Sequence, residues 1–136
     1  MHSIAIKDMA GLLKPRAATM LVSALRKELP DMPIHVHTHD TAGSGLASML
    51  AAADAGADVV DVAIDALSGL TSQPSMGALA AVTQGTGKEI GITVDALEPL
   101  NAYWEQAREE LSPLPCPDTS RLMASERWLT HSSTVA

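Results

Sequence analysis

Apolar and polar positions along the chain predict an alternation of strands and helices. Residues 3–8, SIAIKD, form a short apolar run that ends in two charges, which is typical of a buried strand. From Pro15 to residue 29 the apolar side chains recur at helical spacing, and proline is common in the first turn of a helix. Residues 33–40, PIHVHTHD, alternate with a period of two, which predicts a second strand.

The alternation continues through the second half of the chain. Residues 43–58 predict a helix of small residues that ends near Gly56, and residues 57–65, ADVVDVAID, are as continuously apolar as a buried parallel strand. Two further helices are predicted at residues 75–85 and 94–111. The order β-α-β-α-β-α, with units of roughly 25–30 residues, predicts an α/β fold with a parallel sheet.

Two α/β architectures fit this order. A closed (β/α)8 barrel needs eight strands and about 250 residues, so three units form at most part of one. An open doubly wound sheet is the alternative, but the residues after the first strand, KDMAGLLKP, lack the glycine-rich turn of a dinucleotide site. Residues 112–136 are rich in Pro, Ser and Thr without a period, which predicts an irregular tail. Neither Cys116 nor His131 in that tail is assigned a role.

Charge and composition exclude several classes of function. A net charge of −7 disfavours non-specific binding to nucleic acid or to anionic membranes. The apolar runs are broken before they reach a membrane-spanning length, and the first twelve residues do not resemble a secretory signal. One cysteine cannot form an internal disulfide, which fits a reducing compartment.

Three of the five histidines lie two residues apart, at His35, His37 and His39. Residues two apart on a strand share one face, and near the C-terminal end of a barrel strand this face lines the active-site mouth. Two such imidazoles can bind one divalent metal, although an ordinary polar lining is the alternative. Lys7 ends the preceding strand, where an inward amine is costly unless it is paired, for example with Asp8, or modified. A carboxylated Lys7 with two imidazoles would suit Zn, Mn or Co.

Other polar residues are candidates for supporting roles. We expect Asp8, Asp40 or Thr41 to hydrogen-bond a ligand imidazole, with turn formation as the alternative for Asp40 and Thr41. Asp61 and Asp65 line the site or hold its ligands, although capping is the expected role of Asp65. Residues 71–75, TSQPS, are expected to cap the following helix, with anion contact as the alternative.

Several motifs together resemble a known family. The stretches IKDMAGLLKP, PIHVHTHDTAG, GADVVDVAIDALSGLTSQPSMGA and YWEQAR, within residues 4–108, resemble the carboxyltransferase domain of pyruvate carboxylase. The oxaloacetate decarboxylase α chain and the transcarboxylase 5S subunit are similar around Lys7 but typically differ at Asp40. Acyl-CoA lyases and synthases share the paired histidines but not KDMAGLLKP.

The resemblance implies a (β/α)8 TIM barrel, with its last three βα units at residues 1–92 and a following helix at 93–111. It implies a metal held by Lys7 as N6-carboxylysine, His37 and His39, and by an aspartate outside this sequence, with His35 deeper and packed. The implied reaction of pyruvate metabolism and gluconeogenesis moves CO2 from carboxybiotin to pyruvate and gives oxaloacetate. Biotin is carried, and ATP used, by other domains.

The resemblance also sets limits. The residues that grip pyruvate and the threonine that exchanges a proton with biotin do not occur in this sequence, so we expect the isolated chain to be inactive. The alternatives are a fragment of a decarboxylase- or transcarboxylase-type subunit, or a non-catalytic truncated product. A homotetramer, in the cytoplasm or the mitochondrial matrix, is implied for the intact enzyme. Tyr103 and Trp104 are expected to pack on a neighbour that this chain lacks.

Overall fold

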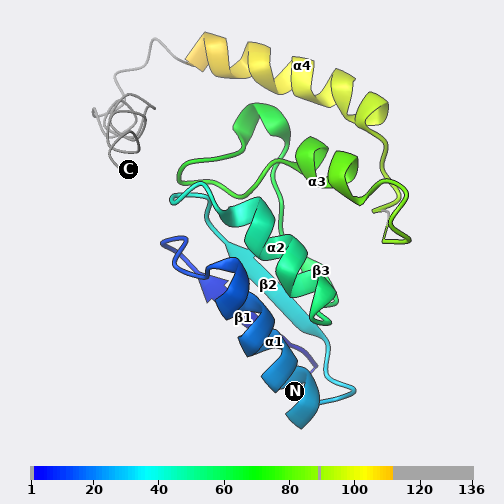
Figure 1. Ribbon diagram of the computed structural model, residues 1–136. Coiled ribbons are helices and arrows are strands. Elements are labelled where there is room, and N and C mark those ends of the chain that lie inside the picture. The colour runs from blue at the N-terminus through cyan, green and yellow to red at the C-terminus, as the bar shows by residue number, and fades with distance from the viewer. Residues whose placement is uncertain (1, 89, 112–136) are drawn as a thin grey trace, which may run out of the picture.

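The computed structural model describes residues 2–88 and 90–111, and the predictions for residues 112–136 lie outside them. Strands and helices alternate along the described chain (Figure 1). Their bounds are β1 Ile4–Asp8, α1 Pro15–Glu28, β2 Ile34–Thr38, α2 Gly45–Asp54, β3 Val59–Val60, the 3-10 turn η1 Asp65–Leu67, α3 Met76–Thr83 and α4 Val94–Leu111. The predicted α/β class is therefore confirmed.

The three strands form one parallel sheet in the order β1-β2-β3. Between β1 and β2, Lys7 pairs with His37 and Asp8 with Thr38. Between β2 and β3, His35 pairs with Val59. Helices α1 and α2 lie side by side on one face of this sheet (Figure 1). Each parallel connection thus crosses over through a helix, as in a βαβ unit.

The core lies between the sheet and the two helices. Successive strand residues point to opposite faces, so alternate residues of β1 and β2 enter the core. Each large aliphatic side chain that is fully buried contributes about 1.5–3 kcal/mol. The fully buried members are Ala18, Val22, Ile34, Val36, Met49 and Ala52, and Ile4 and Ile6 pack against them. Residues of the opposite register, including Lys7 and His37, face away from the helices.

The third strand is shorter and more exposed than the sequence predicts. Its regular pairing is limited to Val59–Val60, followed by one isolated parallel bridge between Ala63 and Ser75. Val59 is 48% exposed because it pairs with His35 and so points to the face of the sheet that α1 and α2 do not cover. The prediction of a buried strand over residues 57–65 was therefore wrong in both length and burial.

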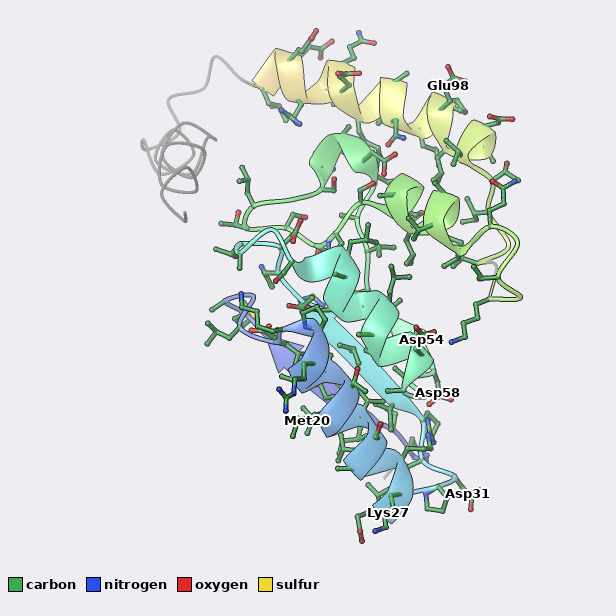
Figure 2. The ribbon with its side chains drawn as sticks, viewed as in Figure 1. Met20, Lys27, Asp31, Asp54, Asp58 and Glu98 are labelled. Atoms are coloured by element: carbon green, nitrogen blue, oxygen red, sulfur yellow. The ribbon has the colours of Figure 1, made fainter. Side chains whose placement is uncertain are left out.

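The Arg26 side chain links several backbone carbonyls at the N-terminal end of the sheet. The Arg26 guanidinium donates to the carbonyls of Gly56, Pro30 and Met32 and to the Asp58 carboxylate. Asp58 also accepts from the Ile34 backbone N–H at 2.7 Å, and these two partners hold the pKa of Asp58 below its usual range. Figure 2 shows Asp58 at the end of the sheet that is remote from α4.

Asp65 joins η1, α3 and α4. One of its carboxylate oxygens accepts from the Ser75 hydroxyl at 2.6 Å and from the Gly77 N–H at 2.7 Å. The other accepts from the Asn101 amide at 2.9 Å. Ser75 in turn accepts from the Ala78 N–H, so the predicted capping by the 71–75 segment is confirmed. Burial raises the pKa of Asp65, but the bonds from Ser75, Gly77 and Asn101 outweigh it and the pKa is lowered.

One side of helix α4 packs against the rest of the described chain, and the other side is exposed to solvent. Leu97 is buried, whereas Tyr103 and Trp104 are 64% and 40% exposed and form an edge-to-face pair with ring centroids 5.3 Å apart. Glu98 points outward from the same helix (Figure 2). Among the described residues, no helix combines the length and apolar character needed to cross a membrane.

We predict that Asp65→Asn lowers the free energy of unfolding by about 1–3 kcal/mol, because its new amide N–H faces a donor. The lowered pKa of Asp65 means that its contribution is full above the unfolded value of about 3.9 and is lost as pH falls through the folded value. The difference in the free energy of unfolding between wild type and variant, measured by urea unfolding, should therefore be smaller at pH 3 than at pH 7. Asp31→Asn, at an exposed site, is the control. An equal gap at both pH values would contradict this account.

Candidate metal site

Two imidazoles converge at the C-terminal end of β2. The Nε2 atoms of His37 and His39 lie 3.3 Å apart, and their rings meet at 67°. Two nitrogen ligands of one tetrahedral zinc, each about 2.0–2.1 Å from it, are separated by roughly 3.3–3.4 Å. The spacing of the two nitrogens therefore fits a shared divalent cation.

The other ring nitrogen of each histidine is hydrogen-bonded to an acceptor. His37 Nδ1 donates to Asp61 at 2.7 Å, and His39 Nδ1 donates to the Thr71 carbonyl at 2.6 Å. A carboxylate whose pKa is lowered and a carbonyl offer no proton, so both Nδ1 atoms carry hydrogen. The Nε2 atoms thus face each other and require a proton or a cation between them. This arrangement is usual for metal-binding histidines.

Lys7 lies beside His37 at the C-terminal ends of β1 and β2. It pairs with His37 across the β1–β2 ladder, and residues paired in this way point to the same face of the sheet. Its side chain is exposed on that face. The described residues hold no cluster of three or more His, Cys, Asp or Glu side chains suited to a metal. Lys7 lies next to His37 in the ladder and on the same face of the sheet.

Two of the residues expected to support the imidazoles, Asp8 and Asp40, bond to other groups. Asp8 accepts from the N–H groups of Leu12 and Leu13 at 3.1 and 2.7 Å and from the Thr38 hydroxyl at 2.9 Å, which closes the loop before α1. Burial raises the pKa of Asp8, but these bonds outweigh it and lower the pKa. Asp40 accepts from the N–H of Gly45 at the start of α2.

Thr41 lies in the turn between β2 and α2. The Nδ1 atoms of His37 and His39 are instead held by Asp61 and by the Thr71 carbonyl. Asp61 was one of the residues expected to line the site or hold its ligands, because it alternates with apolar residues on the predicted third strand. The Thr71 carbonyl was not singled out, because a main-chain oxygen has no signature in the sequence.

Asp61 bridges two histidines of β2. It accepts from His37 Nδ1 through one oxygen and from His35 Nε2 through the other, both at 2.7 Å. Burial raises the pKa of Asp61, but the hydrogen bonds from His37 and His35 outweigh it, and the pKa is lowered. Asp61 is therefore an anion that accepts a hydrogen bond at each oxygen.

The 71–75 segment also reaches the site. The Gln73 side-chain nitrogen lies 3.4 Å from His37 Nε2, and the Gln73 carbonyl accepts from the Gly69 N–H at 2.8 Å. Capping was the role expected for this segment, with anion contact as the alternative, and Gln73 was not singled out. A polar amide beside the two Nε2 atoms can hydrogen-bond an oxygen held at that position.

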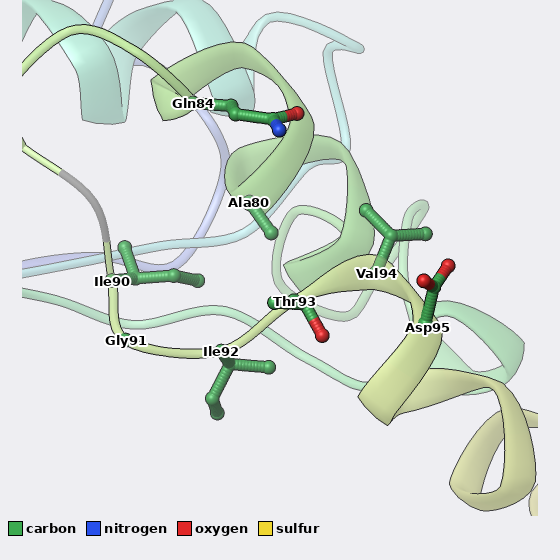
Figure 3. A pocket seen from close by; sticks show the side chains of 8 residues that line it. All are labelled: Ala80, Gln84, Ile90, Gly91, Ile92, Thr93, Val94 and Asp95. Atoms are coloured by element: carbon green, nitrogen blue, oxygen red, sulfur yellow. The ribbon is translucent and has the colours of Figure 1, made fainter.

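A pocket of about 490 Å³ lies elsewhere, between the end of α3 and the start of α4 (Figure 3). Its walls are mainly apolar and include Ile90, Ile92 and Val94, with Gln84 and Asp95 as polar members. None of the predicted ligands lines it. The cavity and the histidine pair are therefore separate features.

The chain is similar to proteins of a known family. A family model named HMGL-like matches residues 1–99, and the chain belongs to this family. Among curated relatives, human mitochondrial pyruvate carboxylase is 56% identical over 120 residues, and pyruvate carboxylase 1 of Caenorhabditis elegans is 55% identical over the same length. These matches cover 88% of this chain and 10% of each relative, so the chain spans about a tenth of their length.

Solved structures give the architecture. The carboxyl transferase domain of Rhizobium etli pyruvate carboxylase, solved with pyruvate, is 49% identical with a TM-score of 0.77, over 80% of this chain and 18% of that one. The same domain solved with pyruvate and biocytin is 50% identical with a TM-score of 0.75, over 79% and 18%. The sheet and its helices are thus part of a (β/α)8 barrel, which confirms the predicted fold and the resemblance.

Gly11 places the loop after β1 against the backbone of His39. Its φ is +64°, and a Cβ added there would lie 2.7 Å from the His39 carbonyl oxygen. Gly91 has a similar φ of +72°, but an added Cβ would meet nothing within 4 Å. The two glycines therefore share the left-handed strain and differ in the contact.

We predict that Gly11→Ala destabilises the chain by more than Gly91→Ala, which costs about 1–2 kcal/mol from backbone strain alone. The additional cost arises because the new methyl group displaces the His39 carbonyl. Thermal unfolding measures the stability, and imidazole NMR signals report the displacement. His39 signals should shift in Gly11→Ala and stay in place in Gly91→Ala. Equal stability losses with unmoved His39 signals would refute the contact.

Proposed function

We propose that this chain supplies the metal-binding edge of a biotin-dependent carboxyltransferase of the pyruvate carboxylase type. The observation that carries the proposal is the 3.3 Å separation of the His37 and His39 Nε2 atoms, each ring being held through Nδ1. Lys7, in register with His37, is the third ligand in the proposal. Zn, Mn or Co fits a set of two nitrogens and one anionic oxygen.

Lys7 acts in this proposal as N6-carboxylysine. Its unprotonated amine nitrogen bonds to the carbon of CO2 and loses one proton to solvent, which leaves an anionic carbamate. The carbamate oxygen replaces a positive charge with a negative one beside the imidazoles. Two neutral nitrogens and one anion then balance part of the charge of a divalent ion, whose role when bound is to stabilise negative charge on a substrate oxygen.

The proposed substrates are pyruvate and carboxybiotin. The carboxyl carbon leaves the biotin nitrogen as CO2 and bonds to the methyl carbon of pyruvate, while the proton from that carbon returns to biotin. His37 and His39 keep the ion beside the developing enolate, where fixed charge lowers the barrier. Solved relatives carrying pyruvate, with or without biocytin, support this assignment.

The chain needs the remainder of the barrel for turnover. Lys7 is exposed, and Val59 at the edge of β3 is 48% exposed, so the described residues leave the rim open to water. Electrostatic stabilisation of an enolate is weaker in a wet site than in an enclosed one. We therefore propose that the isolated chain is inactive, and that biotin and ATP are handled by other domains of the longer protein.

Further features of the intact enzyme remain predictions. The relatives compared above are pyruvate carboxylases, which favours that assignment over a decarboxylase or transcarboxylase subunit. Three mammalian relatives are named mitochondrial, so we propose the mitochondrial matrix or the cytoplasm. The homotetramer stays a prediction from the resemblance.

We predict that the chain binds one Zn²⁺ in the presence of bicarbonate. His37→Ala and His39→Ala should each abolish stoichiometric binding because one of two nitrogen ligands is lost. Lys7→Ala should weaken it at least tenfold and remove its dependence on bicarbonate. Isothermal titration calorimetry measures these changes, and His2→Ala, outside the sheet, is the control. Binding retained in both His37→Ala and His39→Ala would refute the site.

A graft tests the activity itself. Residues 4–108 should replace the matching segment of the Rhizobium etli domain and retain oxaloacetate formation, because the backbones agree. Adding His37→Ala or Lys7→Ala should lower kcat by at least about 100-fold, since a metal supplies several kcal/mol to the transition state. Asp31→Asn in the same graft should leave kcat unchanged. Full activity of the His37→Ala graft would contradict the proposal, and turnover by the isolated chain would contradict its inactivity.

A further inference from the structure

Asp61 is the first residue after β3, and it connects two histidines of the neighbouring strand. His35 and His37 are two residues apart on β2 and therefore point to the same face. The Asp61 carboxylate spans them, with one oxygen 2.7 Å from His35 Nε2 and the other 2.7 Å from His37 Nδ1. All three side chains are partly buried, with exposures of 38%, 25% and 35% for His35, His37 and Asp61.

We propose that Asp61 is a positioning residue that fixes the tautomer and orientation of His37, and that His35 acts through Asp61 by holding its second oxygen. The metal in this proposal rests on the proposed function, whereas the hydrogen-bonded trio does not depend on it. Asp61 acts through His37, and His35 acts through Asp61.

The tautomer follows from the chemistry of the acceptor. A carboxylate that accepts from His37 Nδ1 keeps the ring proton there and leaves Nε2 with a lone pair. A hydrogen bond to a charged acceptor is stronger than one to a neutral acceptor, so the 2.7 Å bond to Asp61 favours the tautomer with hydrogen on Nδ1. Without Asp61, the His37 ring is free to carry its proton on Nε2, and that nitrogen then cannot bind a cation.

His35 is needed because the backbone at Asp61 is weakly held. The regular pairing of β3 ends at Val60, and the Asp61 N–H makes one further bond to the Val36 carbonyl at 3.0 Å. A carboxylate with a single partner at this point could rotate about its side-chain torsions. His35 removes that freedom, because it is fixed within β2 and pairs with Val59.

His39 provides an internal comparison. Its Nδ1 donates to the Thr71 carbonyl rather than to Asp61. Substitution of Asp61 should therefore change the protonation pattern of the His37 ring and leave that of His39 unaltered. A general loss of structure would disturb both rings, so the contrast separates positioning from folding.

The test uses 15N NMR of the imidazoles in the metal-free chain, followed by Zn²⁺ titration. In the wild type, His37 Nδ1 should carry hydrogen. In Asp61→Ala and Asp61→Asn, a population with a bare Nδ1 and a protonated Nε2 should appear at His37 but not at His39. Zn²⁺ affinity should fall about 10–100-fold at unchanged stoichiometry. Asp31→Asn is the matched control and should show neither change.

His35 is tested in the same way. His35→Ala should weaken Zn²⁺ binding, but by less than Asp61→Ala, because Asp61 itself remains. His35→Gln keeps an N–H donor and should restore most of the affinity. If His35→Ala and wild type bind Zn²⁺ equally and share one His37 tautomer, the role of His35 is refuted.

The wild-type spectrum alone can overturn the proposal, whether or not the variants fold. A wild-type His37 with a bare Nδ1 would do so, as would a folded Asp61→Ala variant with an unchanged tautomer and an unchanged Zn²⁺ affinity. A wild-type chain that binds no Zn²⁺ but shows an Asp61-dependent His37 tautomer would support the positioning and contradict the proposed function. The two failures are thus distinguishable.

Discussion

The parallel register between β1 and β2 is the constraint on which the site depends. It pairs Lys7 with His37 while Ile4 pairs with Ile34 in the layer against the helices. A slip of one residue would exchange the two faces, so that charged and imidazole side chains would enter the aliphatic core. The burial of the apolar residues therefore fixes the positions of the candidate ligands, although it contributes nothing to their chemistry.

The fold class could be predicted because apolar residues with helical or strand periodicity report directly on burial. The length of β3 could not, because the apolar run of residues 57–65 indicates that a strand is suited to burial between neighbours. The apolar run does not indicate which neighbouring strands and helices are present. In the structure, pairing stops at Val60, and the chain continues through a bridge at Ala63 into η1.

The histidine pair has a local signal in the sequence, whereas the residues that support it depend on which strands become neighbours. The run of His35, His37 and His39 was recognisable because a two-residue spacing near a strand end is a local signal, and the family resemblance then singled out His37 and His39. Asp8 was proposed as a support because it follows Lys7, but adjacent strand residues point to opposite faces, and Asp8 closes the α1 loop instead. Asp61 becomes a partner of His37 only when β3 pairs with β2, across 24 residues of sequence.

His37 and His39 are held by acceptors of different kinds, a side-chain carboxylate and a main-chain carbonyl. A single codon change can delete the Asp61 carboxylate, but no substitution at position 71 removes a peptide oxygen. Point substitutions therefore affect the orientation of the His37 ring more readily than that of the His39 ring. The orientation of His37 depends on the identity of one side chain, whereas that of His39 depends on the path of the loop that carries Thr71. Insertions and deletions between η1 and α3 are therefore the mutations expected to disturb His39 most.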